Sequence, residues 1–219
     1  MKIFLDTANI EQISQAAELG IISGVTTNPS LLSKEATADY ESVTRKICGL
    51  IEGPVSVEVL AEDAPSMITE ARVKASWATN VNIKVPMTAE GLKATSVLTG
   101  EGIDVNMTLC FSASQALLAA LAGATYVSIF IGRLDDAGHD GMQVVEDTIA
   151  ILENYPGLDT QVIAASVRNP LHVTSSAMAG AHIATVPYNI LMQMIQHPLT
   201  DVGVRKFLAD WEKVAGKKQ

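Results

Sequence analysis

The 219-residue chain has only two cysteines and little charge of either sign. Cys48 and Cys110 match no zinc or redox spacing and give no disulfide framework. Charged residues make up 18% of the chain, against roughly 25% in an average soluble domain. Hydrophobic residues reach 48%, so the folded chain must bury much of itself, part of it between subunits. We therefore expect a cytoplasmic protein with reduced thiols that forms a homo-oligomer.

Basic residues are scarce, and the formal net charge is -9. Nucleic acids and anionic membranes are bound by broad basic surfaces, so neither is expected as a partner. No apolar run approaches the roughly 20 residues of a membrane-spanning helix. Asp6 interrupts the first residues before the core of a signal peptide could form. If the substrate is an anion, a few positively charged side chains must lie close together at its binding site.

Short β-rich runs alternate with helical patterns along the whole chain. Tyr40, Val43, Ile47 and Leu50 recur at the helical spacing of three and four. Helix start signals stand at Asn9, Ser112 and Asn169, and stop signals at Gly123 and Gly180. The eight predicted strands cover residues 2–6, 21–27, 55–60, 81–86, 104–109, 126–131, 161–166 and 182–187. One further amphipathic helix is predicted over residues 201–215.

Eight strand–helix units favour a closed barrel of parallel strands over an open, doubly wound sheet. The Rossmann alternative lacks its nucleotide-binding signature, since the turn after the first strand, at residues 6–9, reads DTAN without a glycine-rich loop. A P-loop is also missing. Composition shows no break and no linker. The sequence therefore predicts an α/β fold, a single-domain (β/α)8 TIM barrel over residues 1–219 with an extra C-terminal helix.

Polar residues interrupt most of the predicted strands and share one side-chain direction. Successive side chains in a strand point to opposite faces, and the outward face of a parallel barrel packs on helices. The polar set is therefore expected to point into the barrel, near the carboxyl ends of the strands where barrel enzymes build their sites. In chain order the inward set is Phe4 and Asp6, Thr26 and Asn28, Ser56 and Glu58, Lys84, Asn106 and Thr108, Ser128 and Phe130, and Ala164 and Ser166.

Lys84, Glu58 and Asp6 carry most of the functional argument. Taken singly, each has an ordinary structural explanation: a strand lysine can reach water at an edge, and Asp6 could cap the first helix. A closed barrel has no edge, so burying all three without a purpose would be costly. A lysine must be neutral to attack a carbonyl, a form that an enclosed site favours, and two carboxylates could move protons beside it.

Fixed donors for a phosphate group follow the sixth and seventh strands. Arg133 stands just past residue 131, and Ser166 and Arg168 end the next strand, offering guanidinium groups and a hydroxyl. A metal site is the alternative in this part of the chain, where Asp135, Asp136, His139 and Asp140 lie close together. Their spacing matches no known ligand pattern, and residues 133–141 are typical of a solvated loop. We expect no metal and no cofactor.

The chain resembles the transaldolase family, in particular its short-chain branch, which includes the fructose 6-phosphate aldolases. The resemblance covers essentially the whole chain. Its specific stretches are residues 4–8, 24–30, 57–59, 83–86, 106–109, 132–135 and 165–170, which read FLDTA, GVTTNPS, VEV, IKVP, NMTL, GRLD and ASVRNP.

This resemblance implies a mechanism in which Lys84 forms a Schiff base with the C2 carbonyl of a ketose phosphate. It implies that Glu58 and Thr108 activate a water, and that Asp6 takes the C4 hydroxyl proton as the C3–C4 bond breaks. The remaining positions implied to bind substrate are Thr26, Asn28, Asn106, Ser128 and Phe130 for the sugar and Arg133, Ser166 and Arg168 for the phosphate. No cofactor is implied, and the short chains of the family form ring-based oligomers, pentamers or decamers, with a C-terminal helix reaching a neighbour.

Two positions bear on the branch of the family. The aldolases carry glutamine where this chain has Glu58 and tyrosine where it has Phe130. A phenol beside the enamine could protonate it and release free dihydroxyacetone, whereas phenylalanine withholds that proton. The sequence thus favours a transaldolase of the pentose phosphate pathway. The alternatives are a fructose 6-phosphate aldolase, an aldolase acting on deoxysugars, and a catalytically silent barrel that binds sugar phosphate.

Overall fold

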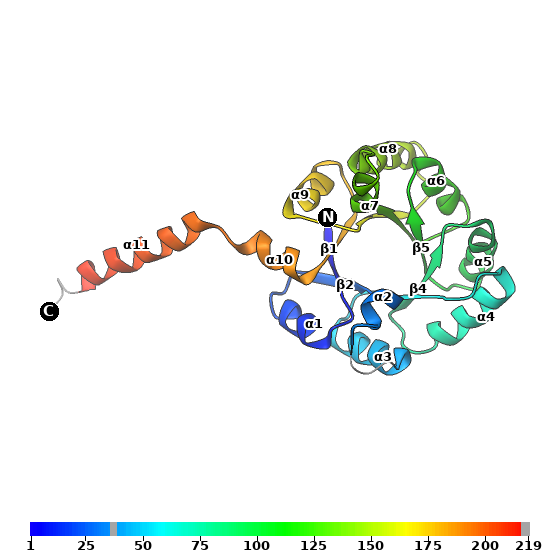
Figure 1. The fold of residues 1–219 in the computed structure, drawn as a ribbon, viewed down its shortest axis with the longest axis horizontal. Coiled ribbons are helices and arrows are strands. Elements are labelled where there is room, and N and C mark those ends of the chain that lie inside the picture. The colour runs from blue at the N-terminus through cyan, green and yellow to red at the C-terminus, as the bar shows by residue number, and fades with distance from the viewer. Residues whose placement is uncertain (36–38, 216–219) are drawn as a thin grey trace.

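A computed structural model describes residues 1–35 and 39–215 and shows a closed barrel of eight parallel strands ringed by helices (Figure 1). The strands are β1 (Lys2–Asp6), β2 (Ile22–Thr26), β3 (Val55–Glu58), β4 (Val81–Pro86), β5 (Val105–Cys110), β6 (Tyr126–Phe130), β7 (Gln161–Ala165) and β8 (Ile183–Val186). Neighbours in the ring follow chain order, and β8 pairs with β1 to close it. The predicted TIM barrel is confirmed, and every predicted strand lies within two residues of its observed bounds.

The helices alternate with the strands and cover the outside of the barrel. They are α1 (Ile10–Ala17), α2 (Pro29–Leu32), α3 (Tyr40–Leu50), α4 (Ala64–Ala75), α5 (Ala89–Gly100), α6 (Ala113–Leu121), α7 (Ile131–Asp136), α8 (Gly141–Glu153), α9 (Pro170–Met178), α10 (Tyr188–Ile195) and α11 (Pro198–Ala215). The predicted start signals are confirmed, because Asn9, Ser112 and Asn169 each accept a hydrogen bond from a main-chain N–H three residues on. Gly123 and Gly180 end α6 and α9 with positive φ angles of 89° and 83°.

Two apolar layers hold the barrel. The larger lies between strands and helices and includes Val57, Ile83 and Met107, all fully buried. The smaller fills the barrel interior, where Phe4 lies edge to face with Tyr126 at a centroid distance of 6.3 Å. This smaller layer lies on the strands that face Lys84 across the barrel. The polar site and the smaller apolar layer therefore share the barrel interior.

The strand ladder is uneven around the ring. β2 pairs with β3 through only two residue pairs, Val25 with Val55 and Thr26 with Ser56. β3 then continues alongside β4 for two more residues, to the pair of Glu58 with Lys84. The barrel wall therefore opens between β2 and β3 at its carboxyl end, where a parallel barrel builds its site.

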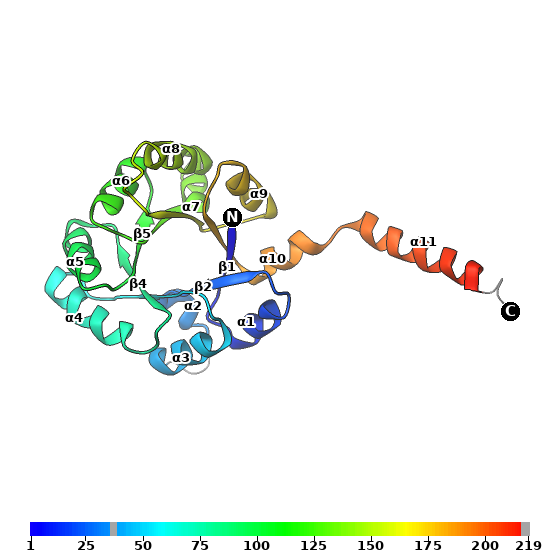
Figure 2. The ribbon, with the colours of Figure 1, turned by 180° about the vertical axis from the view of Figure 1, so that it is seen from behind.

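Three details differ from the sequence prediction. Residues 133–136, expected at the start of a loop over 133–141, belong instead to α7, because the chain turns into a helix directly after Phe130. Strand β3 ends at Glu58 and not at residue 60, since the carboxylate of Glu70 takes the N–H groups of Leu60 and Ala61 at 2.9 Å each. The last helix begins at Pro198 and extends away from the barrel in both views (Figures 1 and 2).

Among the residues that the structure describes, none of the helices is both long enough and apolar enough to cross a bilayer.

The start of α5 rests directly on the end of β4, and this generates a stability prediction. A Cβ on Gly91 would lie 2.0 Å from the carbonyl oxygen of Pro86, whereas a Cβ on Gly100 of the same helix meets no atom within 4 Å. We expect Gly91→Ala to destabilise the fold by about 2 kcal/mol or more through overpacking, and Gly100→Ala to be neutral or stabilising by up to about 1 kcal/mol. Denaturant unfolding of both variants measures the difference, and equal midpoints would contradict the contact.

Candidate active site

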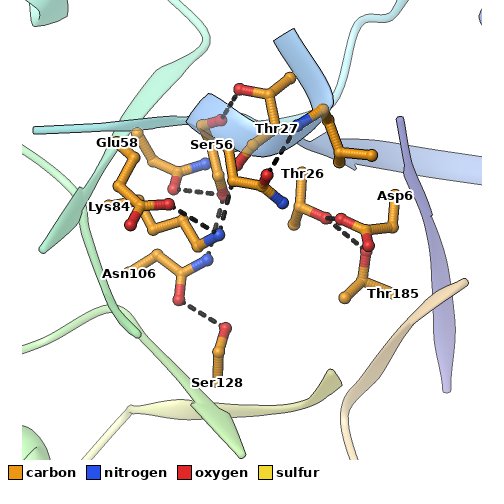
Figure 3. Close-up of polar contacts among 12 residues, drawn as sticks. Asp6, Thr26, Thr27, Ser56, Glu58, Lys84, Asn106, Ser128 and Thr185 are labelled. Atoms are coloured by element: carbon orange, nitrogen blue, oxygen red, sulfur yellow. Dashed lines mark hydrogen bonds and ion pairs between the residues drawn. The ribbon is translucent and has the colours of Figure 1, made fainter. Parts of the chain in front are cut away.

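Lys84 lies inside the barrel on β4, and only 5% of the residue is exposed. Its Nζ is 3.2 Å from Oε2 of Glu58, which stands beside it on β3 (Figure 3). Nζ also donates a hydrogen bond to the main-chain carbonyl of Thr27 at 3.2 Å. The predicted neighbours therefore meet, and the ammonium is satisfied by one charged and one neutral acceptor.

Asp6 stands across the lumen at the end of β1. Thr26 donates its hydroxyl proton to Oδ1 of Asp6 at 2.7 Å, and Thr185 lies 2.6 Å from the same Thr26 oxygen (Figure 3). Because Thr26 has one proton to give, Thr185 is the donor of that second bond when Asp6 is ionised. Burial raises the pKa of Asp6, and this outweighs the nearby Lys84 ammonium and the Thr26 hydrogen bond, which lower it.

Thr185 is a site residue that the sequence reasoning missed. It lies on β8, two residues after Ile183 and on the same inward face, and it lines the pocket above Asp6. The signal was available, since the alternation used for the other strands also applies to the predicted strand at 182–187.

A network of amide and hydroxyl groups runs through the barrel beneath Lys84. Ser56 donates to Oδ1 of Asn82 at 2.8 Å, Asn106 donates to Ser56 at 3.0 Å, and Ser128 donates to Oδ1 of Asn106 at 2.7 Å. Figure 3 shows Asn106 held between Ser56 and Ser128. Asn106 is fully buried, with both ends of its amide occupied, whereas Ser128 also lines the pocket.

Two adjoining cavities open above this network, with volumes of about 160 and 230 Å³. Both are lined by Asn28, Lys84, Phe130 and Arg133. Glu58 and Thr108 line the larger cavity, while Asp6, Thr26 and Ser128 line the smaller one. The buried hydroxyl of Thr108 has no hydrogen-bond partner within the described residues, so it is available to a molecule in the cavity beside Lys84.

Arg133, Ser166 and Arg168 meet at the wall of the smaller cavity. The guanidinium of Arg133 lies 4.8 Å from the centre of the Phe130 ring, a cation–π distance. Arg168 pairs with Asp136, with Nη2 2.9 Å from Oδ2, and both side chains are more than half exposed. Gly132 permits this arrangement, since a Cβ there would lie 2.0 Å from the carbonyl oxygen of Ser166.

The side-chain parity predicted for the seventh strand was wrong in part. Ile163 and Ala165 face the interior, and Ala164 faces the helices. Ser166 still reaches the pocket because its φ of 60° interrupts the alternation directly after β7. A left-handed backbone at a serine is uncommon, and here it turns the residue toward Arg133.

The carboxylates considered as a metal alternative have protein partners. Asp135 accepts from the N–H of Gly141 at 3.0 Å and lies 3.1 Å from Nε2 of His172. Asp136 pairs with Arg168, and Asp140 caps α8. In the described part of the chain, no group of three or more His, Cys, Asp or Glu residues is arranged to hold a metal ion.

The arrangement has the parts of an amine-based carbonyl site. A lysine amine lies between two carboxylates on different strands, and guanidinium groups stand at the wall of the same pocket. An amine in this position can attack a carbonyl, and the carboxylates can move the protons. The guanidinium groups suit a substrate that carries an anionic group.

Comparison with known proteins gives one consistent family. The family model described as "Transaldolase/Fructose-6-phosphate aldolase" matches residues 3–218. A protein named "Probable transaldolase" from Dehalococcoides mccartyi is 60% identical over 98% of this chain and 99% of its own length. Proteins with the same name from Desulforudis audaxviator and a Thermoanaerobacter species are 61% and 57% identical, over 98% and 100% of this chain and 99% and 100% of their own lengths.

Among solved structures, the chain is similar to a thiamine phosphate pyrophosphorylase from Pyrococcus furiosus. The TM-score is 0.59, the sequence identity is 14%, and 85% of each chain is covered. At this identity the likeness concerns the barrel fold alone.

The raised pKa of Asp6 predicts a gain of stability in Asp6→Asn. A carboxyl whose pKa is higher in the folded state destabilises the fold as pH rises above its ordinary value of 3.8, and has no such effect below it. We therefore expect Asp6→Asn to unfold at a higher midpoint than the wild type at about pH 7.5 and at the same midpoint at about pH 4.

Asp63 provides a control of opposite sign. Hydrogen bonds from Ser66 hold the pKa of Asp63 below its ordinary value, so Asp63→Asn should lower the midpoint at neutral pH. A loss of stability in Asp6→Asn at about pH 7.5 would mean that the hydrogen bond from Thr26 outweighs burial.

Proposed function

Because this chain belongs to the transaldolase/fructose-6-phosphate aldolase family, we propose that it is a transaldolase acting through a Schiff base on Lys84. It moves a dihydroxyacetone unit from fructose 6-phosphate or sedoheptulose 7-phosphate to an aldose phosphate. The observation that carries the proposal is the enclosed Lys84 amine, 3.2 Å from the carboxylate of Glu58 in a pocket that also holds Asp6 and Arg133. This reaction belongs to the pentose phosphate pathway, and the two free thiols support a reducing compartment such as the cytoplasm.

The first half of the reaction forms the covalent intermediate. The neutral amine of Lys84 attacks the C2 carbonyl of the ketose, and the carbinolamine loses water to give the Schiff base. Glu58 and Thr108 share the cavity beside Nζ, and a water between them could carry the protons in both directions. The unpartnered hydroxyl of Thr108 supports such a water site.

Bond cleavage is assigned to Asp6. Its carboxylate takes the proton of the C4 hydroxyl, the C3–C4 electron pair moves into the protonated imine, and glyceraldehyde 3-phosphate leaves. The enamine that remains on Lys84 then adds to erythrose 4-phosphate, and Asp6 returns its proton to the new hydroxyl. Hydrolysis of the resulting Schiff base releases sedoheptulose 7-phosphate and restores the amine of Lys84. The raised pKa of Asp6 supports this role, since a carboxylate with a higher pKa is a better base.

The substrate's phosphate is assigned to Arg133, Ser166 and Arg168. The pair of Arg168 with Asp136 is exposed, so a dianionic phosphate can replace the carboxylate at modest cost. Asn28 and Ser128 line the pocket and suit the sugar hydroxyls, and Asn106 supports Ser128 from below. Thr26 acts on the substrate through Asp6, to which it donates.

Transfer is favoured over release of free dihydroxyacetone because of Phe130. Its apolar ring lines both cavities and lies against Arg133, and it has no proton to give the enamine. An aldolase that releases dihydroxyacetone remains the second candidate. A silent sugar-phosphate-binding barrel is disfavoured, because Lys84, Glu58 and Asp6 are all present in one site.

A ring-shaped homo-oligomer, a pentamer or decamer, is also proposed. Helix α11 leaves its own barrel (Figure 1). It carries exposed apolar side chains, including Phe207 at 73% and Trp211 at 68% exposure. An isolated amphipathic helix of this length is marginal in water, so its apolar face needs a partner surface. An arm that reaches away from its own barrel suits a head-to-tail contact with a second copy, which closes into a ring.

Trapping with borohydride tests the chemistry. After incubation with fructose 6-phosphate alone, reduction should leave a dihydroxyacetone-sized adduct on Lys84, found by mass spectrometry of the digested protein. Lys84→Arg keeps the cation but offers no amine and should carry no adduct. Addition of erythrose 4-phosphate before reduction should remove the adduct and yield sedoheptulose 7-phosphate.

The same experiment separates the alternatives. Steady release of dihydroxyacetone without an acceptor would establish the aldolase. A folded protein that binds the sugar phosphate and carries no adduct would establish the silent barrel.

The oligomer is tested by measuring mass in solution. The full chain should form a ring, and removal of residues 198–219 should give a monomer. Phe207→Asp should weaken assembly, and Lys206→Gln, on the same helix, should leave it intact, because only the first change puts a charge on the apolar face. A full-length chain that is monomeric at micromolar concentration would refute the proposal.

A further inference from the structure

We propose that Tyr40 and Lys74, which touch neither cavity above Lys84, are positioning residues for Glu58. They take the place of the missing strand partner of Glu58 and fix the carboxylate beside Lys84. This inference rests on the proposed function, because it assigns the two residues a part in the Schiff-base chemistry of that site.

The main chain of Glu58 lacks its neighbour in β2. The N–H groups of Val55 and Val59 both donate toward β4, to Asn80 at 2.8 Å and Lys84 at 3.0 Å. By the alternation of a parallel strand, the N–H and C=O of Glu58 point the other way, toward β2. The last ladder bond there runs from the N–H of Thr27 to Ser56 at 3.2 Å, and the pairing then ends.

Two side chains from the surrounding helices form hydrogen bonds with the N–H and C=O groups of Glu58. The hydroxyl oxygen of Tyr40, the first residue of α3, accepts from the N–H of Glu58 at 2.9 Å. Nζ of Lys74, near the end of α4, donates to the carbonyl of Glu58 at 2.6 Å. Both main-chain groups of one residue are thus held by side chains, each in place of a strand bond.

Lys74 is itself held firmly. Its Nζ lies 2.8 Å from Oε1 of Glu70 and 4.6 Å from the centre of the Tyr40 ring, and only 5% of the residue is exposed. The Tyr40 ring packs edge to face on Trp77 at 5.6 Å. A buried ammonium is costly even when paired, and an apolar side chain would fill the space with less penalty. Its ammonium has one further acceptor here, the carbonyl of Glu58 at 2.6 Å, which an apolar side chain could not hold.

The opening between β2 and β3 affects both Lys84 and Glu58. It frees the carbonyl of Thr27 to accept from Lys84 at 3.2 Å, and it leaves the end of β3 to be set by Tyr40 and Lys74. Figure 3 shows Thr27 and Glu58 on either side of Lys84. Without these anchors the end of β3 has no fixed position on its β2 side, and the carboxylate of Glu58 loses its alignment with Nζ.

The test uses Tyr40→Phe, which removes one oxygen, and Lys74→Met, which keeps the side-chain length. In the full-length enzyme, each should lower kcat for transfer from fructose 6-phosphate to erythrose 4-phosphate by about tenfold. Active sites are counted by borohydride trapping, and the KM for the acceptor should stay within about twofold, since neither residue lines the pocket. Lys74→Arg keeps a donor and should recover part of the loss.

The matched controls are Tyr155→Phe and Lys93→Met, both at exposed positions. They should retain full kcat. A role that is only structural would lower the count of trapped sites and leave kcat per trapped site unchanged, and this result would overturn the inference.

A double-mutant cycle with Glu58→Gln gives the sharpest comparison. The measured quantity is the rate at which the adduct on Lys84 that borohydride can trap forms with fructose 6-phosphate. If Tyr40 and Lys74 act through the carboxylate, Tyr40→Phe should slow trapping about tenfold in the wild type and less than about twofold in Glu58→Gln. Equal losses in both backgrounds would refute the assignment while leaving the proposed function intact. Absence of any adduct in the wild type would refute the function itself, and the inference with it.

Discussion

An ammonium group inside a closed barrel must find its acceptors there, since a closed ring of strands has no edge that opens to water. Lys84 has two, the carboxylate of Glu58 and the carbonyl of Thr27. The carbonyl is free only because β2 and β3 separate after two residue pairs. The burial of the Lys84 ammonium therefore depends on the point at which β2 and β3 separate. The remaining polar groups of the lumen lie around this ammonium.

The site retains features that oppose stability. Asp6 has a raised pKa, Thr108 has a buried hydroxyl without a partner in the described part of the chain, and Leu109 and Ser166 adopt left-handed backbone angles of 59° and 60°. Each of the two left-handed residues costs of order 1–3 kcal/mol. The apolar layer between strands and helices offsets these terms.

Strand alternation predicted the inward position of Lys84, Glu58 and Thr108, because a two-residue period holds wherever a strand is regular. It failed at Ala164, which packs in the outer layer, and Ser166 reaches the pocket only because its left-handed backbone breaks the period. It could not indicate the carbonyl of Thr27, which carries no sequence signal. The surroundings of Lys74 were equally out of reach, because Tyr40 and Glu70 meet it only after α3 and α4 have packed on the barrel. The functional roles proposed for Lys84, Glu58, Thr108 and Ser166 stay predictions.

The pairing of β1 with β8 also constrains how the chain is made. During synthesis β1 is made before the other strands, and its partner β8 is made after all of them. The barrel can close only once β8 has been made. Contacts between such distant segments form slowly, so nascent chains keep open strand edges that invite aggregation. Helix α11, with its exposed apolar side chains, follows β8 in the chain, so it is made only after the strands that form the ring.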